Sequence, residues 1–262
     1  MRRRPSAILA LALIAGCAIG TAPARSLAAG LNAQKPTHVL FIGNSLTYYN
    51  LMPALFGQIA KSRGIDTQAR MWVRGGATLK WHWTGGDLEH KLASEKFDVV
   101  VIQPQSSEII AAPDETRQYA SLIADAARAN GAQVVLYAPW PAKAALAQSD
   151  QFAQRYRALA ASIHARIAPV FAAWTDVRSQ GQELYDASAL HPNLAGSYIA
   201  ACVLFATIFQ KDPIGATHTF DVRVPDQSED FAALRLEHID EAEAQKLQRA
   251  AWRAVQSEPL AR

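Results

Sequence analysis

Cysteine is scarce in this sequence, and so is any excess of charge. Cys17 and Cys202 are the only two cysteines in 262 residues. Three of the 26 basic residues are the arginines at positions 2–4, and without them 23 basic residues balance 23 acidic ones. A chain with this balance lacks the basic surface that binds nucleic acid, so we expect no nucleic-acid partner.

A long hydrophobic run is also missing. The apolar stretch at residues 7–19 follows the three arginines and is too short for a comfortable membrane span. A charged start, a short apolar middle and small residues after it predict a secretory signal and processing region over residues 1–29. Cleavage sites are available at residues 22–24 and 27–29, whereas the residues leading to Cys17 resemble a bacterial lipobox, in which that cysteine carries a lipid. Both outcomes predict an exported protein, periplasmic or secreted, with membrane contact only through a lipid anchor at Cys17. One cysteine then remains, which leaves no intrachain disulfide.

Half of the sequence is hydrophobic, which is enough for one sizeable core. Runs typical of strands alternate with segments of helical periodicity. The predicted strands cover residues 38–42, 66–73, 98–102, 133–137 and, weakly, 170–171. The predicted helices cover residues 53–61, 113–129, 149–163 and 192–209 and begin again near 240, after a loop-rich extension at 211–238. This alternation predicts a single α/β domain over residues 36–262, a three-layer α/β/α sandwich around a mostly parallel five-stranded sheet.

One segment combines a strand, a tight turn and a nucleophile. The predicted strand at residues 38–42 ends at Gly43, and Ser45 follows before a predicted helix. Ligands of α/β folds bind at the carboxyl edge of the sheet, where this turn would present the serine hydroxyl. Because serine is a weak nucleophile, it needs a base to take its proton. Without such a base, Ser45 is simply a turn residue.

His191 is the candidate for that base among the seven histidines. It lies in an irregular stretch just before Pro192, which we expect to start the next helix. Asp186 lies a few residues upstream and can orient one ring nitrogen. The other ring nitrogen is then free to accept the serine proton.

Two loops at predicted strand ends offer hydrogen-bond donors. Gly75 and Gly76 follow the second strand, and glycines allow backbone N–H groups to approach a negatively charged oxygen. Gln103 and Gln105 follow the third strand, and an amide side chain can donate to the same oxygen. Each loop taken alone is equally consistent with an ordinary turn.

The order serine, glycine loop, amide loop and histidine resembles the SGNH (GDSL-like) hydrolase superfamily. Residues 43–46, Gly-Asn-Ser-Leu, stand where that family has Gly-Asp-Ser-Leu. Residues 75–83 and 196–202 resemble a bacterial subgroup whose substrates are largely undefined. The resemblance runs from about His38 to the C-terminal helix and implies the family's flavodoxin-like α/β fold.

This resemblance implies serine esterase chemistry that uses no metal and no other cofactor. Ser45 would be the nucleophile and His191 the general base. The oxyanion would be held by the backbone N–H groups of Ser45 and of Gly76 or Gly75, and by an amide side chain. The expected partner is a small-molecule or glycan ester.

Two positions depart from the family pattern. The third block lacks its asparagine, and we assign that role to Gln105, with Gln103 as the second choice. Ser188 stands where the family has the aspartate three residues before the histidine. Asp186 serves as the acid if the loop bulges; otherwise Ser188 or a backbone carbonyl orients His191, which would leave a catalytic dyad.

Aromatic side chains gather near the predicted strand ends: Tyr48, Tyr49, Trp72, Trp81, Trp83 and Trp140. Flat rings beside an ester site suit the faces of sugars, although aromatic residues also serve as core. The residues that we assign to the substrate pocket are Asn44, Tyr48, Trp81, His82 and Trp140. His82 and His90 have no acids at metal-ligand spacing, so we propose no metal site.

Together these features predict an exported serine esterase. Its leading substrate class is O-acetylated carbohydrate. An O-acyltransferase acting on a glycan would use the same residues. A non-catalytic carbohydrate-binding protein on this scaffold is the third alternative, because the asparagine and the aspartate of the family pattern are missing.

Overall fold

A five-stranded parallel sheet lies at the centre of the fold. The computed structural model describes residues 35–225 and 232–258, so the predicted signal region and Cys17 lie outside the described residues. The strands are β1 (Thr37–Gly43), β2 (Thr67–Val73), β3 (Val99–Ile102), β4 (Gln133–Ala138) and β5 (Arg166–Pro169). Their order across the sheet is β2-β1-β3-β4-β5, and every neighbouring pair is parallel. The predicted α/β class and five-stranded sheet are therefore confirmed.

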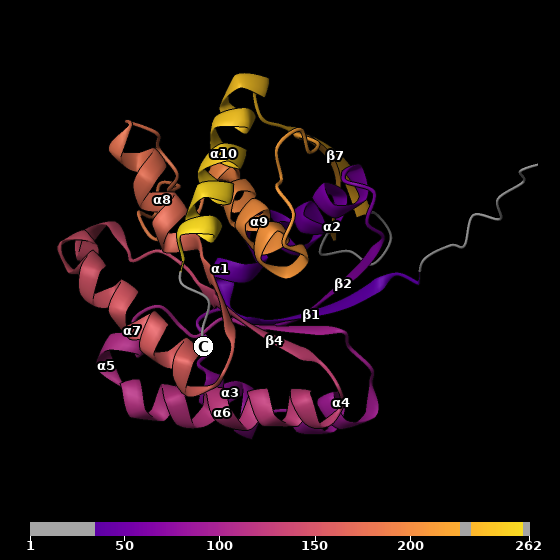
Figure 1. Cartoon of the computed structure of the whole chain (residues 1–262), viewed down its shortest axis with the longest axis vertical. Helices are drawn as coiled ribbons and strands as arrows, with labels where there is room; N and C mark the ends of the chain where they lie inside the picture. Colours follow the sequence, from indigo (N-terminus) through magenta and orange to yellow (C-terminus); the bar gives the residue numbers. More distant parts are fainter. Residues whose placement is uncertain (1–34, 226–231, 259–262) are drawn as a thin grey trace, which may run out of the picture. The chain divides into compact units, whose positions relative to one another are not determined.

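Helices cover both faces of the sheet (Figure 1). One face carries α2 (Met52–Ser62), α8 (Val170–Ser179), α9 (Leu194–Phe209) and α10 (Glu241–Ser257). The other carries α3 (Leu79–Thr84), α4 (Leu88–Ser94), α5 (Glu108–Ala111), α6 (Pro113–Ala129) and α7 (Ser149–Ser162). Side chains of β1 alternate between the two cores, with Val39 and Phe41 in the first and Leu40 and Ile42 in the second. The predicted three-layer sandwich is confirmed.

The nucleophile segment leads directly out of β1. Helix α1 (Ser45–Tyr48) and the 3₁₀ helix η1 (Tyr49–Leu51) connect the strand to α2. Because β1 lies between β2 and β3, the loops that follow these three strands meet at one edge of the sheet. Parallel strands end at the same edge, so this order places the predicted serine, glycine and glutamine loops side by side.

Two predicted boundaries were wrong. Residues 170–171 begin helix α8, and the fifth strand lies just before them, where Pro169 ends it. Helix α9 begins after Pro192, because Asn193 is its cap and accepts a hydrogen bond from the Gly196 N–H at 2.9 Å. Pro192 instead forms an isolated β-bridge with Tyr185.

The predicted loop-rich extension at residues 211–238 contains a β-hairpin. Strands β6 (Thr219–Pro225) and β7 (Ala232–His238) pair in antiparallel fashion apart from the main sheet. The side chain of Gln58 donates to the Asp221 carbonyl at 3.0 Å and accepts from its N–H at 3.2 Å, which fixes the hairpin to α2. Among the described residues, no helix combines the length and the apolar character needed to cross a membrane.

Candidate active site

Ser45 is presented by a capped turn at the end of β1. The side chain of Asn44 accepts a hydrogen bond from the Leu46 N–H at 3.1 Å and so caps helix α1, of which Ser45 is the first residue. A first helical residue has no intrahelical acceptor for its N–H, so the Ser45 N–H is available to another acceptor. Asn44 itself is 2% exposed, which corrects its assignment to the substrate pocket.

His191 lies at Ser45, as the sequence predicted. The Ser45 hydroxyl is 3.0 Å from His191 Nε2, although the two residues are 146 positions apart. The ring of Tyr49 stacks on the imidazole, with ring centres 4.1 Å apart and planes within 4°. The hydroxyl can therefore donate its proton directly to a ring whose plane is held by a neighbouring aromatic side chain.

Ser188, not Asp186, is the direct partner of the other imidazole nitrogen. Its Oγ lies 3.0 Å from His191 Nδ1. The Asp186 carboxylate accepts hydrogen bonds from the Ser188 hydroxyl and from the Ser188 N–H, the latter at 2.8 Å. The prediction that Asp186 itself orients His191 is thus corrected, because Ser188 lies between them.

The glycine loop is fastened to the nucleophile turn at both of its ends. The Arg74 N–H donates to the Gly43 carbonyl at 3.2 Å, and the Asn44 amide donates to the Ala77 carbonyl at 3.3 Å. Between these anchors, Gly76 adopts a positive φ of 68°, a conformation that glycine takes without strain. The loop is therefore held beside Ser45 in a form that can offer backbone N–H groups to an oxyanion.

Gln103 supports the turn that carries Ser45 through hydrogen bonds. It is buried, and its Oε1 accepts from the Asn44 N–H at 2.9 Å and from the Thr47 hydroxyl at 2.8 Å. Its Nε2 donates to the Pro104 carbonyl. A Cβ at Gly43 would come within 2.5 Å of Gln103 Oε1, which explains the glycine at the end of β1. Gln103 is thus a supporting residue rather than an oxyanion donor.

Gln105 has a different arrangement that keeps its amide donor free. Its Oε1 accepts from the N–H groups of Ser107 and Glu108, each at 2.9 Å. These bonds direct the amide oxygen of Gln105 toward the start of helix α5, so its Nε2 is not used there. No hydrogen-bond partner of its Nε2 occurs in the described part of the chain, so Gln105 is the better candidate for the amide donor.

His82 is buried beneath the same turn and does not line a pocket. It is 1% exposed, and its Nε2 lies 2.9 Å from the Gly43 carbonyl, to which the neutral ring donates. Burial lowers the pKa of His82, more than the bond to Gly43 raises it. This corrects its assignment to the substrate pocket and makes it a support of the nucleophile strand. Within the described residues, no three His, Cys, Asp or Glu side chains are grouped as a metal site requires.

The aromatic residues divide into buried supports and half-buried rings. Trp140 is fully buried and stacks on Trp174 at 3.7 Å, and its Nε1 donates to the Leu190 carbonyl at 3.0 Å. It therefore supports the loop that carries His191, which corrects its assignment to the pocket. Trp81 and Tyr48 remain half-buried, and the Arg74 guanidinium lies over the Trp81 ring at 4.5 Å.

Two residues that the sequence analysis left without a role join the two halves of the site. Tyr49 stacks on His191 as described above. Asn50 adopts a positive φ of 51°, and its amide donates to the Pro192 carbonyl at 3.1 Å and to the Ser197 hydroxyl at 2.9 Å. The only signal for them in the sequence was their position directly after Ser45.

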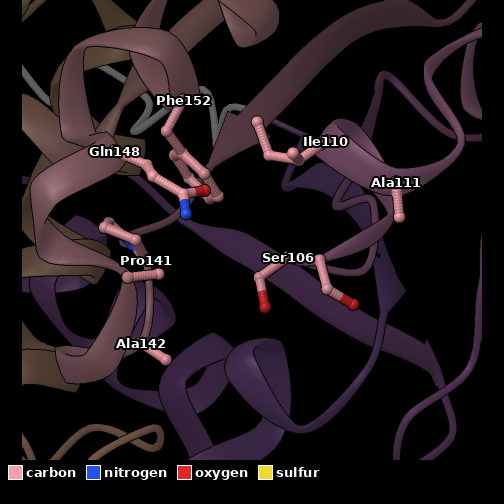
Figure 2. Close-up of a pocket in the computed structure, with 9 residues that line it drawn as sticks. Ser106, Ile110, Ala111, Pro141, Ala142, Gln148 and Phe152 are labelled. Carbon is pink, nitrogen blue, oxygen red and sulfur yellow. The ribbon is translucent and has the colours of Figure 1, made fainter.

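A cavity of about 270 Å³ opens between the loops that follow β3 and β4. Figure 2 shows Ser106 and Ile110 on one side of it and Pro141, Ala142 and Phe152 on the other. Ser106 directly follows Gln105, the candidate amide donor. Most of these side chains are apolar or small, so the cavity suits an apolar group.

Comparison with solved structures places this geometry in a family. A protein from Slackia heliotrinireducens, described as an SGNH hydrolase, is 30% identical over 66% of this chain and 99% of its own, with a TM-score of 0.55. A DUF4886 family protein from Bacteroides uniformis shares the fold at 17% identity, over 85% of this chain and 95% of its own, with a TM-score of 0.61. The lipase/acylhydrolase from Enterococcus faecalis shares it at 16% identity, over 66% and 95%, with a TM-score of 0.55.

A scan of family models and a search of curated proteins gave no match. The relative from Slackia heliotrinireducens is nevertheless matched over nearly its whole length. In the present chain, Ser45 and His191 are in contact at the carboxyl edge of the sheet. The chain therefore belongs to the SGNH hydrolases and is a serine hydrolase of the esterase type.

Proposed function

We propose that this protein is an exported carboxylic ester hydrolase whose substrates are O-acetylated carbohydrates. The observation that carries the proposal is the 3.0 Å contact between Ser45 Oγ and His191 Nε2. Half-buried Tyr48 lies beside the glycine loop and offers a flat surface for a sugar ring, while the Arg74 guanidinium covers one face of Trp81. Export rests on the charged and apolar pattern of the first residues.

The reaction follows from the positions of these groups. Ser45 Oγ attacks the acyl carbonyl carbon while its proton passes to His191 Nε2. Negative charge develops on the carbonyl oxygen, where the N–H groups of Ser45, of the glycine loop and of Gln105 can donate to it. His191 then returns the proton to the departing alcohol oxygen. Water releases the acyl group from Ser45 by the same proton transfers in reverse.

The cavity beside Ser106 favours a second substrate class, esters of longer apolar acyl chains. Its small and apolar lining offers a chain of several carbons a place away from water. A series of nitrophenyl esters from acetyl to octanoyl separates the two candidates. An acetyl preference supports the carbohydrate ester, whereas a preference for longer chains that is lost in Ala142→Phe, which fills the cavity, supports the second class.

The nucleophile is tested with Ser45→Ala and, as a matched control, Ser179→Ala at the exposed end of α8. We expect wild type and Ser179→Ala to hydrolyse nitrophenyl acetate, to react with a fluorophosphonate probe and to release free acetate from an acetylated glycan. Ser45→Ala should do none of these while unfolding at the wild-type temperature. Equal hydrolysis by Ser45→Ala would disprove the mechanism.

Export is tested on full-length protein produced in a bacterial host. We expect the recovered protein to lie outside the cytoplasm and to begin after residue 24 or 29, or at a lipid-modified Cys17. Mass spectrometry of the N-terminal peptide distinguishes these forms. An unprocessed protein confined to the cytoplasm would contradict this part of the proposal.

A further inference from the structure

We propose that Ser188 is a hydroxyl relay that connects the Asp186 carboxylate to His191, so that four side chains act in series: Asp186, Ser188, His191 and Ser45. This inference rests on the proposed esterase function and adds a positioning residue to it. The related family places an aspartate where this chain has Ser188. In this chain the carboxylate, that of Asp186, is still present, but it reaches His191 through the Ser188 hydroxyl instead of contacting the imidazole directly.

The hydrogen bonds of Ser188 favour one arrangement of its proton. Its Oγ lies within 3.0 Å of the His191 N–H and within 3.3 Å of the Leu190 N–H, both of which can only donate. A carboxylate can only accept, so the hydroxyl proton points to Asp186. Ser188 Oγ is then purely an acceptor towards the imidazole. His191 Nδ1 must therefore carry a proton, which leaves Nε2 unprotonated and facing Ser45, as a general base requires.

The backbone holds this relay in place. The Asp186 N–H donates to the His191 carbonyl at 2.9 Å, and the Ala189 N–H donates back to the Asp186 carbonyl at 3.2 Å. Ala189 has a positive φ of 58°, a conformation that costs free energy for a residue with a Cβ. From outside the loop, the Lys143 N–H donates to the Ala189 carbonyl at 2.9 Å. The loop backbone therefore keeps Ser188 next to the imidazole, where its hydroxyl contacts both His191 and Asp186.

No other carboxylate is placed to substitute for Asp186 among the described residues around this loop. The nearby Glu183 is engaged by the Lys143 ammonium at 2.7 Å and by the N–H groups of Leu184 and Tyr185. Tyr49, which stacks on His191, brings no charge. Among the residues that the structure describes, Asp186 is thus the one carboxylate connected to His191, and the Ser188 hydroxyl transmits its effect to the imidazolium that forms during the reaction.

Four variants test the relay: Asp186→Asn, Ser188→Ala, Ser188→Asp and the double variant Ser188→Asp/Asp186→Asn. Asp186→Asn keeps an acceptor for Ser188 but removes the charge, whereas Ser188→Asp places a carboxylate directly at Nδ1. We expect Asp186→Asn and Ser188→Ala each to lower kcat about 10–100-fold with little change in KM, less than the roughly 10⁴-fold loss for a direct triad aspartate. In the Ser188→Asp background, Asp186→Asn should have almost no effect on kcat. Asp150→Asn, an exposed carboxylate in α7, is the control for an unrelated loss of charge.

A second readout separates a relay from a merely structural role. Loss of the negative charge makes the imidazolium less stable, so the lower pH midpoint of kcat/KM should fall in Asp186→Asn and Ser188→Ala and return in Ser188→Asp. The same order should appear when the His191 ring is titrated by NMR, which needs no substrate. An inactive wild-type protein would overturn the esterase proposal while this titration still tests the relay. An unchanged His191 titration in Asp186→Asn, or an undiminished effect of that substitution in the Ser188→Asp background, would overturn the relay.

Discussion

An amide side chain can stabilise an oxyanion only if the fold leaves its N–H group free, and this criterion separates Gln105 from Gln103. We predict that Gln105→Glu, which keeps the acceptor for the Ser107 and Glu108 N–H groups but removes the donor, lowers kcat about 10²–10³-fold. The measurement is the steady-state hydrolysis of the best nitrophenyl ester. Gln118→Glu makes the same charge change on the exposed face of α6, outside the cavity, and should stay close to wild type. Equal losses of kcat in both variants would show that the added negative charge, and not the lost N–H donor, lowers the rate.

His82 gives the protein a pH dependence of stability. Because burial lowers its pKa, the unfolded chain binds a proton near pH 6.5, its ordinary range, that the folded chain does not bind. The stability from this residue is therefore complete above that pH and is lost as the pH falls through the lowered folded pKa. We predict that wild type loses more free energy of unfolding than His82→Gln between about pH 7 and about pH 5, measured by urea unfolding. Glutamine can still donate to Gly43 but does not titrate, so identical losses would assign the effect to other groups.

At the level of residues, the sequence identified the members of the site that belong to a motif. Ser45 and His191 lie in such motifs, and the structure places them in contact. Ser188 was only one of the alternatives for orienting His191, and Asn50 had no assigned role, because their contacts depend on left-handed backbone at Ala189 and at Asn50 itself. Neither position is a glycine, so the residue types give no sign of this conformation.

At the scale of elements, we expect alanine substitutions at two helical glycines to change the free energy of unfolding in opposite directions. A Cβ at Gly57 in α2 would lie 3.5 Å from the Thr67 hydroxyl, an ordinary contact, whereas one at Gly196 in α9 would collide with the Leu184 carbonyl and reach the Trp174 ring at 2.7 Å. Alanine is favoured over glycine inside a helix by about 0.5–1 kcal/mol, and overpacking costs about 1–3 kcal/mol. We predict that Gly57→Ala raises the free energy of unfolding and that Gly196→Ala lowers it. Urea unfolding of the pair checks both signs, and stabilisation by Gly196→Ala would show that α9 can shift away from Trp174.

Elements were predictable where one local pattern was long and strong. The predicted helix at residues 113–129 matches α6, Pro113–Ala129, because its start and its apolar spacing agree. The fifth strand was misplaced because Arg166–Pro169 is only four residues long, and the apolar residues after it pack as helix α8. The hairpin of β6 and β7 was missed because its pairing is apart from the main sheet and its polar surroundings resemble a loop.

At the scale of the whole molecule, the sheet order alone brings three of the four site loops together. Strand β1 lies between β2 and β3, so the serine, glycine and glutamine loops are neighbours at one edge. His191 comes from the distant end of the chain and needs a separate fastening, which the Asn50 amide provides through Pro192 and Ser197. The alternation of strands and helices predicted the first arrangement. The second depends on side-chain contacts between distant segments, which no local pattern encodes.

The two helical layers are joined across the β5 edge of the sheet by Arg157 of α7 and Glu258 after α10. Two parallel hydrogen bonds of 2.7 and 2.9 Å connect the guanidinium to the carboxylate, which is 8% exposed and raises the pKa of Arg157. Because Arg157 stays 46% exposed, solvent screening limits the coupling to about 1 kcal/mol of unfolding free energy. We predict this value from a double-mutant cycle of Arg157→Gln and Glu258→Gln, with a decrease in 1 M salt. The exposed pair Arg117 and Asp114 lies within one helix and should give about 0.3–0.5 kcal/mol. Equal coupling in both cycles would mean that the contact between layers adds nothing to an ordinary surface ion pair.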